Sequence, residues 1–137
     1  MIRFIAGEKG QGKTKKLIGL ANESAKTTDG SLVYIDDDKR HIYDLHYAIR
    51  FVCTVNFPLS NGGEFIGFVC GILSQDSDIK EIFIDGLTNI VSTIRFADLP
   101  ELVQKLENLS RQNHVDFIIS INAKKSELPS EIQEITD

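Results

Sequence analysis

A short glycine-rich segment near the start of the 137-residue chain restricts its fold more than any other feature. Residues 7–14 read GEKGQGKT, and the five residues before them, IRFIA, form a mostly apolar run as in a buried strand. After the segment, apolar residues recur with helical spacing at Leu17, Ile18, Ala21 and Ala25. The sequence therefore predicts a strand, a tight loop and a helix in direct succession.

The residue types of this segment suit an anionic ligand. Glycines allow backbone conformations closed to other residues, so successive N–H groups can surround phosphate oxygens at the positive end of the helix. Lys13 supplies a mobile charge for terminal phosphates, and the Thr14 hydroxyl suits Mg²⁺. We expect the cofactor-binding residues of the segment to be Gly7, Glu8, Lys9, Gly10, Gln11, Gly12, Lys13, Thr14 and Lys15. A dinucleotide-binding loop is a weaker match because Lys15 stands where its third glycine belongs.

Further apolar runs alternate with helical patterns along the chain. We expect strands at residues 32–35, 49–55, 81–85 and 115–121, and helices at residues 39–47, 64–74, 98–112 and 129–135. Asp98 and Glu101 have the spacing of a capping box at the start of one helix. This alternation is typical of a parallel sheet covered on both faces. We predict a single α/β domain over residues 1–137, a three-layer sandwich with a mostly parallel sheet of about five strands.

Polar residues follow several of the predicted strands. Right-handed crossovers place the carboxyl ends of parallel strands at one edge of the sheet, where ligands bind. Asp85 follows a buried strand and is expected to bind Mg²⁺ opposite Thr14. Ser120 and Asn122 end the last strand, where they either sense the terminal phosphate of a nucleotide or are ordinary strand-end polar residues.

Three successive acids, residues 36–38, follow the second predicted strand. They have two interpretations: as caps of the next helix, where negative charge is favoured, or as groups that position water, contact a nucleoside or join the metal shell. For the second alternative, Lys13, Asp37 and Asp38 are the candidate catalytic residues. The sequence leaves both alternatives open.

Composition and charge narrow the function classes. A net charge of −5 argues against a nucleic-acid-binding protein, since such proteins carry a basic face. No apolar run approaches the ~20 residues of a membrane-spanning helix, so we expect no membrane span. Cys53 and Cys70 are isolated and form no metal-binding or redox pair. We expect a cytoplasmic protein.

Two motifs make the chain resemble P-loop NTPases. Residues 7–14 match the Walker A pattern, and the strand ending at Asp85 resembles a Walker B strand. The predicted last strand, residues 115–121, ends in polar residues. In this it is similar to one branch of P-loop NTPases, in which the corresponding strand lies between the Walker A and Walker B strands. Through residues 7–16, 34–38 and 83–86 the chain also resembles small P-loop ATP-binding proteins of clostridia and other Firmicutes, often labelled twitching-motility ATPases. The resemblance implies a P-loop NTPase fold that binds ATP and Mg²⁺.

The chain also departs from the ATPase pattern. Gly86 stands where that branch usually has a glutamate after the Walker B aspartate, and Asn122 is not followed by a guanine-reading motif. The first expectation is an ATP–Mg²⁺-binding protein with weak or partner-dependent ATPase activity, its partner being another protein or a second copy. The alternatives are a nucleoside or nucleotide kinase and a non-hydrolysing, nucleotide-gated interaction module. Whether the chain is an enzyme is left open.

Overall fold

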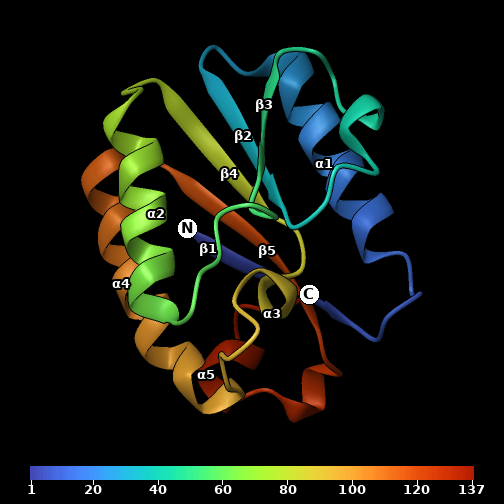
Figure 1. Ribbon diagram of the computed structural model, residues 1–137, viewed down its shortest axis with the longest axis vertical. Coiled ribbons are helices and arrows are strands. Elements are labelled where there is room, and N and C mark those ends of the chain that lie inside the picture. The colour runs from blue at the N-terminus through green and yellow to red at the C-terminus, as the bar shows by residue number, and fades with distance from the viewer.

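A five-stranded, all-parallel sheet forms the centre of the molecule (Figure 1). The computed structural model describes all 137 residues. The strands are β1 (Ile2–Gly7), β2 (Ser31–Asp36), β3 (Ile49–Cys53), β4 (Ile79–Ile84) and β5 (Asp116–Asn122). Their order in the sheet is β1-β5-β4-β2-β3. The last strand thus separates β1 from β4, as predicted.

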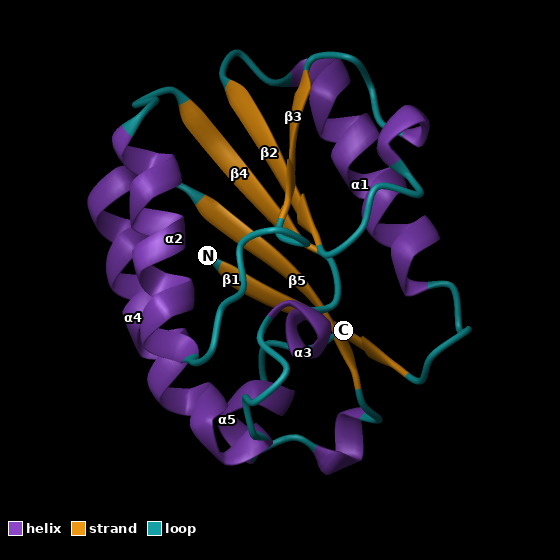
Figure 2. Ribbon diagram, in the orientation of Figure 1, coloured by secondary structure: helices purple, strands orange, loops and turns teal.

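Helices cover both faces of this sheet. They are α1 (Lys13–Thr27), α2 (Gly62–Ser74), α3 (Leu87–Ile90), α4 (Leu99–Asn113) and α5 (Ser130–Gln133). Helices α2 and α4 contact each other on one side of the sheet, and α1 lies on the other (Figure 2). The predicted α/β class is confirmed, and the layers are compatible with a three-layer sandwich. None of the helices combines the length and the apolar character needed to cross a membrane.

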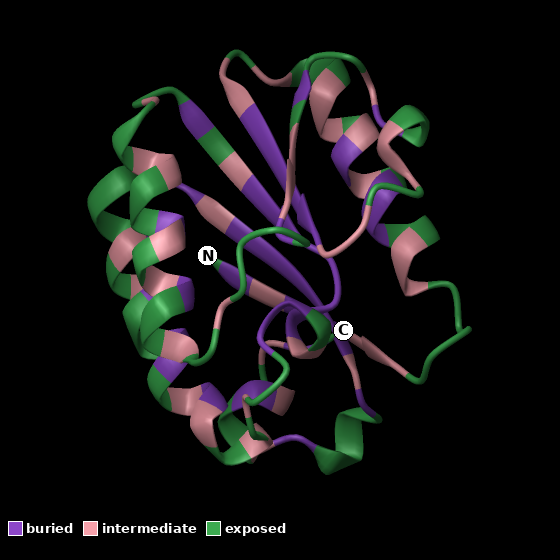
Figure 3. Ribbon diagram, in the orientation of Figure 1, coloured by how far each residue is buried: buried purple, intermediate pink, exposed green.

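Two apolar clusters, one on each face of the sheet, form the core. The larger contains 23 buried residues on the side of α2 and α4, and the smaller contains 10 on the side of α1. Strand β5 contributes to both, because Phe117 and Ile119 face the larger cluster while Ile118 faces the smaller. Strands β2, β4 and β5 are accordingly buried along most of their length, whereas the edge strand β3 is only partly buried. The exposed residues lie on the outer sides of the helices and on the loops (Figure 3).

The helix predicted over residues 39–47 is wrong. The segment contains only a 3₁₀ turn, Ile42–Asp44. Asn22 of α1 bonds this segment at two points, accepting from the His46 backbone N–H at 2.7 Å and donating to the Asp44 carbonyl at 2.9 Å. Leu45 is the one residue of this segment buried in the core, and Tyr43 is 96% exposed, so the segment has no continuous apolar face to bury as a helix. Bonds to a neighbouring element therefore replace helical ones.

The predicted capping box at the start of α4 is also wrong. Helix α4 begins at Leu99, and the Asp98 side chain makes no capping hydrogen bond. Its carboxylate accepts from the Arg95 backbone N–H at 3.1 Å and pairs with the Arg95 guanidinium at 3.2 Å. The acid is therefore used by the preceding turn, a local alternative that short polar side chains often adopt.

Strand β1 has hydrogen-bonded neighbours on both sides. Strand β5 pairs with one edge, and residues 135–137 lie along the other. The Phe4 N–H donates to the Ile135 carbonyl at 2.8 Å, and the Asp137 N–H donates to the Phe4 carbonyl at 3.0 Å. The Asp137 carboxylate also pairs with Arg3 of β1 and with Lys16 of α1. The strand that leads into the glycine-rich loop is therefore firmly held.

Gly30 allows two backbone segments to approach closely before β2. A Cβ atom added at Gly30 would lie 2.4 Å from the Asp78 carbonyl oxygen. We predict that Gly30→Ala lowers the free energy of unfolding by ~1–3 kcal/mol, because the backbone must shift. Urea denaturation measures this change.

Gly19 supplies the matched control. It lies within α1, and a Cβ atom there meets no atom within 4 Å. Gly19→Ala should raise the free energy of unfolding by ~0.5–1 kcal/mol, because alanine favours the helix. Equal effects of the two substitutions would contradict the close approach at Gly30.

Candidate functional site

The register of the strands brings most of the polar strand-end residues together. Gly7 lies beside Asn122 across β1 and β5. The pairing of β4 with β5 ends where Ile84 lies opposite Ile119, directly before Asp85 and Ser120. The pairing of β2 with β4 ends where Ile35 lies opposite Ile84, directly before Asp36 and Asp85. The parallel sheet thus places these side chains along the same edge as the start of the glycine-rich loop.

The glycine-rich loop, residues 7–14, has a compact conformation. Gly10 and Gly12 have φ angles of 88° and 79°, in the left-handed region that favours glycine. The Gln11 side-chain oxygen accepts from the Glu8 N–H at 2.6 Å, and the Lys13 ammonium donates to the Glu8 carbonyl at 2.9 Å. The loop therefore holds its own shape and carries its lysine folded back over it.

A cavity of about 390 Å³, lined by no hydrophobic residue, lies against this loop. Its walls contain the cationic side chains of Lys9, Lys13 and Arg40, the last paired with Asp38, against one carboxylate, so the balance of charge still favours an anion. The lining residues are Lys9, Gly10, Gly12, Lys13, Thr14, Arg40, Asp85, Gly86, Asn89 and Asn122. Partial burial lowers the pKa of Lys13, and the nearby Asp85 carboxylate opposes this shift.

Three hydroxyl groups bond the Asp85 carboxylate, which is only 6% exposed. Oδ1 accepts from Thr14 at 3.2 Å and from Ser120 at 3.1 Å, while Oδ2 accepts from Tyr34 at 2.7 Å. Ser120 in turn accepts a hydrogen bond from the Gly86 N–H at 2.8 Å. The donors come from α1, β2 and β5, so the carboxylate links the glycine-rich loop to the middle of the sheet.

Thr14 and Asp85 fit a small hard cation. Mg²⁺ binds oxygen in an octahedron with distances of 2.0–2.1 Å, which places adjacent ligand atoms about 2.9 Å apart. The Thr14 hydroxyl oxygen and Asp85 Oδ1 lie 3.2 Å apart and line the polar cavity. Both the donor atoms and their separation therefore suit neighbouring positions in a Mg²⁺ shell.

Asp36 is a buried acid with a strongly perturbed titration. It is 5% exposed, and its Oδ1 accepts from the Asp37 N–H at 2.7 Å. Burial raises the pKa of Asp36 to about 8, and contact with the Asp37 side chain and the charge of Asp85 act in the same direction. Asp36 is therefore largely protonated at neutral pH.

The other two acids of this group have different surroundings. Their carboxylate oxygens and that of Asp36 lie within 4.8 Å of one another. Asp38 accepts from the Arg40 N–H at 2.9 Å and pairs with the Arg40 guanidinium at 3.0 Å. Asp37 lines a neighbouring cavity of about 280 Å³, which shares Asn89 with the first. No regular helix follows the three acids, so they do not cap one.

Several sequence-predicted residues lie outside the cavity. Glu8, Gln11 and Lys15 are exposed, and Glu8 pairs with Lys124 at 3.4 Å. Ser120 is fully buried and contacts Asp85 without lining the cavity. Of the residues expected to bind the cofactor, the cavity gathers Lys9, Gly10, Gly12, Lys13, Thr14 and Asn122.

Sequence reasoning missed Tyr34, Arg40 and Asn89. Tyr34 lies in an apolar run and resembles any core aromatic residue, although a buried phenol usually needs a hydrogen-bond partner. That requirement, together with the nearby acids, was the available signal. Arg40 and Asn89 reach the cavity through the irregular segment after β2 and the short helix α3, where the sequence shows no pattern.

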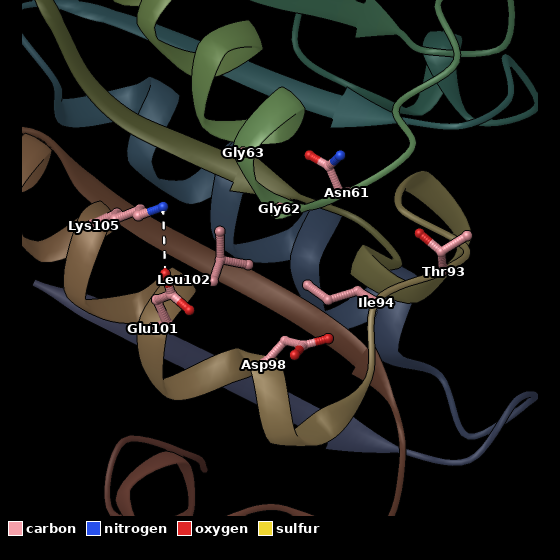
Figure 4. A pocket seen from close by; sticks show the side chains of 9 residues that line it. All are labelled: Asn61, Gly62, Gly63, Thr93, Ile94, Asp98, Glu101, Leu102 and Lys105. Carbon is pink, nitrogen blue, oxygen red and sulfur yellow. Dashed lines mark ion pairs between the residues drawn. The ribbon is translucent and has the colours of Figure 1, made fainter.

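A second cavity lies away from this site, between the starts of α2 and α4 (Figure 4). Its volume is about 240 Å³, and it contains the carboxylates of Asp98 and Glu101. Lys105 pairs with Glu101 at 3.7 Å, which leaves little positive charge for an anion. The cavity beside the glycine-rich loop is therefore the better candidate for phosphate.

Two comparisons with known proteins found no match for this chain. No protein-family model matches it, and no curated protein matches it. The functional argument therefore depends on the geometry of the cavity and on the chemistry of the residues around it.

The burial of Asp36 predicts a pH dependence of stability. The pKa of Asp36 is about 8 in the folded protein, against an ordinary value of ~3.9, so between these values the folded state binds the extra proton. This contribution to stability is present in full below pH ~4 and is lost as the pH rises through ~8. Asp36→Asn should reduce the fall in the free energy of unfolding between pH 5 and pH 9, relative to the wild type.

Urea denaturation at a series of pH values measures this difference. Asp29→Asn, at an exposed acid, is the matched control and should keep the wild-type pH profile. The expectation fails if Asp36→Asn and the wild type lose the same stability over this range.

Proposed function

We propose that this chain is a P-loop protein that binds ATP together with Mg²⁺ and hydrolyses it slowly or only with a partner. The proposal rests mainly on the 3.2 Å separation of the Thr14 hydroxyl and the Asp85 carboxylate in the cationic cavity beside the glycine-rich loop. A phosphate loop, a metal-ligand pair and excess positive charge are what a nucleoside triphosphate with Mg²⁺ requires.

Each group has a distinct role in this proposal. The loop amides and Lys13 bind phosphate oxygens, and Lys13 exchanges its bond with the Glu8 carbonyl for one with the terminal phosphate. Thr14 and Asp85 hold Mg²⁺, which neutralises charge on the phosphate oxygens. Asn122 lines the same cavity and donates a hydrogen bond to the terminal phosphate.

The surroundings of the acids favour slow hydrolysis. In-line attack requires an oriented water molecule, and Gly86 provides no carboxylate after Asp85. Asp36 is largely protonated at neutral pH because its pKa is about 8, which makes it a weak base there. Arg40 is paired with Asp38, so its guanidinium is already engaged. A protein partner or a second copy would supply the missing group.

The neighbouring cavity favours a kinase as a second candidate. It has a volume of about 280 Å³, shares Asn89 with the phosphate cavity and contains the Asp37 carboxylate, which could accept a proton from a hydroxyl. Phosphate transfer to added nucleosides and nucleotides, followed by chromatography of the products, tests this alternative. Product formation that disappears in Asp37→Asn would favour a kinase over a hydrolase.

The first prediction of the proposal concerns binding. We expect Lys13→Ala to weaken the affinity for ATP with Mg²⁺ at least ~10-fold, or 1.4 kcal/mol, because the cavity loses one of its cationic side chains. Isothermal titration calorimetry measures the affinity. Lys105→Ala, in the second cavity, is the matched control and should bind as the wild type does. Equal binding by wild type and Lys13→Ala, or none by either, would refute the site.

The second prediction concerns turnover. We expect the isolated protein to hydrolyse ATP below ~0.1 s⁻¹, against a median of ~10 s⁻¹ for enzymes. A phosphate-release assay on the purified protein measures this rate. Rapid turnover that is lost in Asp37→Asn or Asp38→Asn would contradict the prediction and would assign the catalytic role to these acids.

A further inference from the structure

The two oxygens of the Asp85 carboxylate have different partners. Oδ1 is bonded by Thr14 and Ser120, and Thr14 lines the cavity beside the glycine-rich loop. Oδ2 is bonded by the Tyr34 phenol at 2.7 Å. A tyrosine hydroxyl carries its proton at neutral pH and a carboxylate oxygen only accepts, so Tyr34 is the donor. One oxygen is thus directed to the metal-ligand pair, and the other is held from the core.

The Tyr34 ring is fixed between two others on the α1 side of the sheet. Its centroid lies 6.4 Å from that of Phe51 and 6.3 Å from that of Phe83, with interplanar angles of 17° and 18°. These three residues pair directly across β3, β2 and β4. Phe83 and Asp85 are two residues apart, so both face the side where Tyr34 lies. Tyr34 is fully buried and has little freedom to move away from the carboxylate.

This arrangement affects which cation suits the site. Ca²⁺ takes six to eight oxygen ligands and often binds both oxygens of a carboxylate, whereas Mg²⁺ prefers octahedral, one-oxygen coordination with several waters. The Tyr34 hydroxyl, which is fully buried, holds Oδ2 of Asp85 toward the core, whereas Oδ1 lies beside Thr14, which lines the cavity. For both oxygens to face one cation in the cavity, the carboxylate would have to turn Oδ2 away from Tyr34 and distort this buried hydrogen bond.

We propose that Tyr34 is a positioning residue that sets metal specificity: by holding Oδ2 of Asp85, it limits the carboxylate to one-oxygen coordination and favours Mg²⁺ over Ca²⁺. The inference depends on the proposed binding of ATP with a divalent cation. It assigns to a fully buried tyrosine, which does not line the cavity, a role that burial alone would not give it.

Calorimetric titration of ATP in EDTA, in Mg²⁺ and in Ca²⁺ tests the role of Tyr34. For Tyr34→Phe we expect affinity with Mg²⁺ to fall about tenfold, as for loss of a hydrogen bond to a charged group. Affinity with Ca²⁺ should change less than ~2-fold, because the freed oxygen becomes available to the larger ion. Affinity for ATP in EDTA should not change. The ratio of the ATP affinity in Mg²⁺ to that in Ca²⁺ should therefore fall.

Two further variants separate specificity from general damage. Ser120→Ala removes a hydroxyl from Oδ1 instead of Oδ2, so it should weaken binding with both cations and keep their ratio. Phe51→Leu keeps the Tyr34 hydroxyl but removes one of the two rings stacked on it. It should lower the ratio of the Mg²⁺ affinity to the Ca²⁺ affinity by a smaller factor than Tyr34→Phe does. This second variant tests the inference even if Tyr34→Phe fails to fold.

The outcomes distinguish this inference from the proposed function. If the wild type binds no ATP with either cation, the proposed function fails and the inference fails with it. If it binds ATP with Mg²⁺ but the cation preference is unchanged in Tyr34→Phe and Phe51→Leu, only the role of Tyr34 is overturned. An equal change of the ratio in Ser120→Ala would also overturn it, because loss of any hydroxyl on the carboxylate would then suffice.

Discussion

The buried carboxylate of Asp85 is the interaction on which the rest of this structure depends. A charge removed from water is stable only if polar partners satisfy it, and here hydroxyls from α1, β2 and β5 do so. No buried side-chain polar atom lacks a hydrogen-bond partner. Because the three donors come from distant parts of the sequence, their shared acceptor fixes the start of α1 relative to three strands. The glycine-rich loop takes its position from this junction.

Much of the fold could be predicted because its signals are local. Apolar runs such as residues 81–85 and helical periodicity such as that after Thr14 lie within short windows, and they correctly indicated an α/β protein with a parallel sheet. The edge residues Asp85 and Asn122 followed from the rule that parallel strands end together. The position of the last strand between β1 and β4 was expected from the resemblance and is confirmed, whereas the places of β2 and β3 in the sheet were not predicted.

The errors and omissions arose where distant contacts decide the structure. The segment after β2 is bonded by Asn22 rather than by itself, and no sequence window reveals that partner. The Tyr34 hydroxyl meets Asp85 across 51 residues, so its role depends on the register of β2 with β4. The Asp98 carboxylate could have bonded either the first turn of α4 or the preceding residue Arg95, and a propensity rule cannot choose between these partners. The polar details of the candidate site are therefore properties of the assembled sheet.

Strand β1, bonded along both edges, also bears on the rate at which a ligand would associate and leave. A loop anchored on such a strand, with left-handed glycines already in place, need not become ordered when a ligand arrives. Association is then governed by diffusion and charge, without a preceding folding step. The residence time of a bound ligand would depend on how fast its individual contacts break. A contact with Lys13 is one example, because the Lys13 ammonium can return to the Glu8 carbonyl when the ligand leaves.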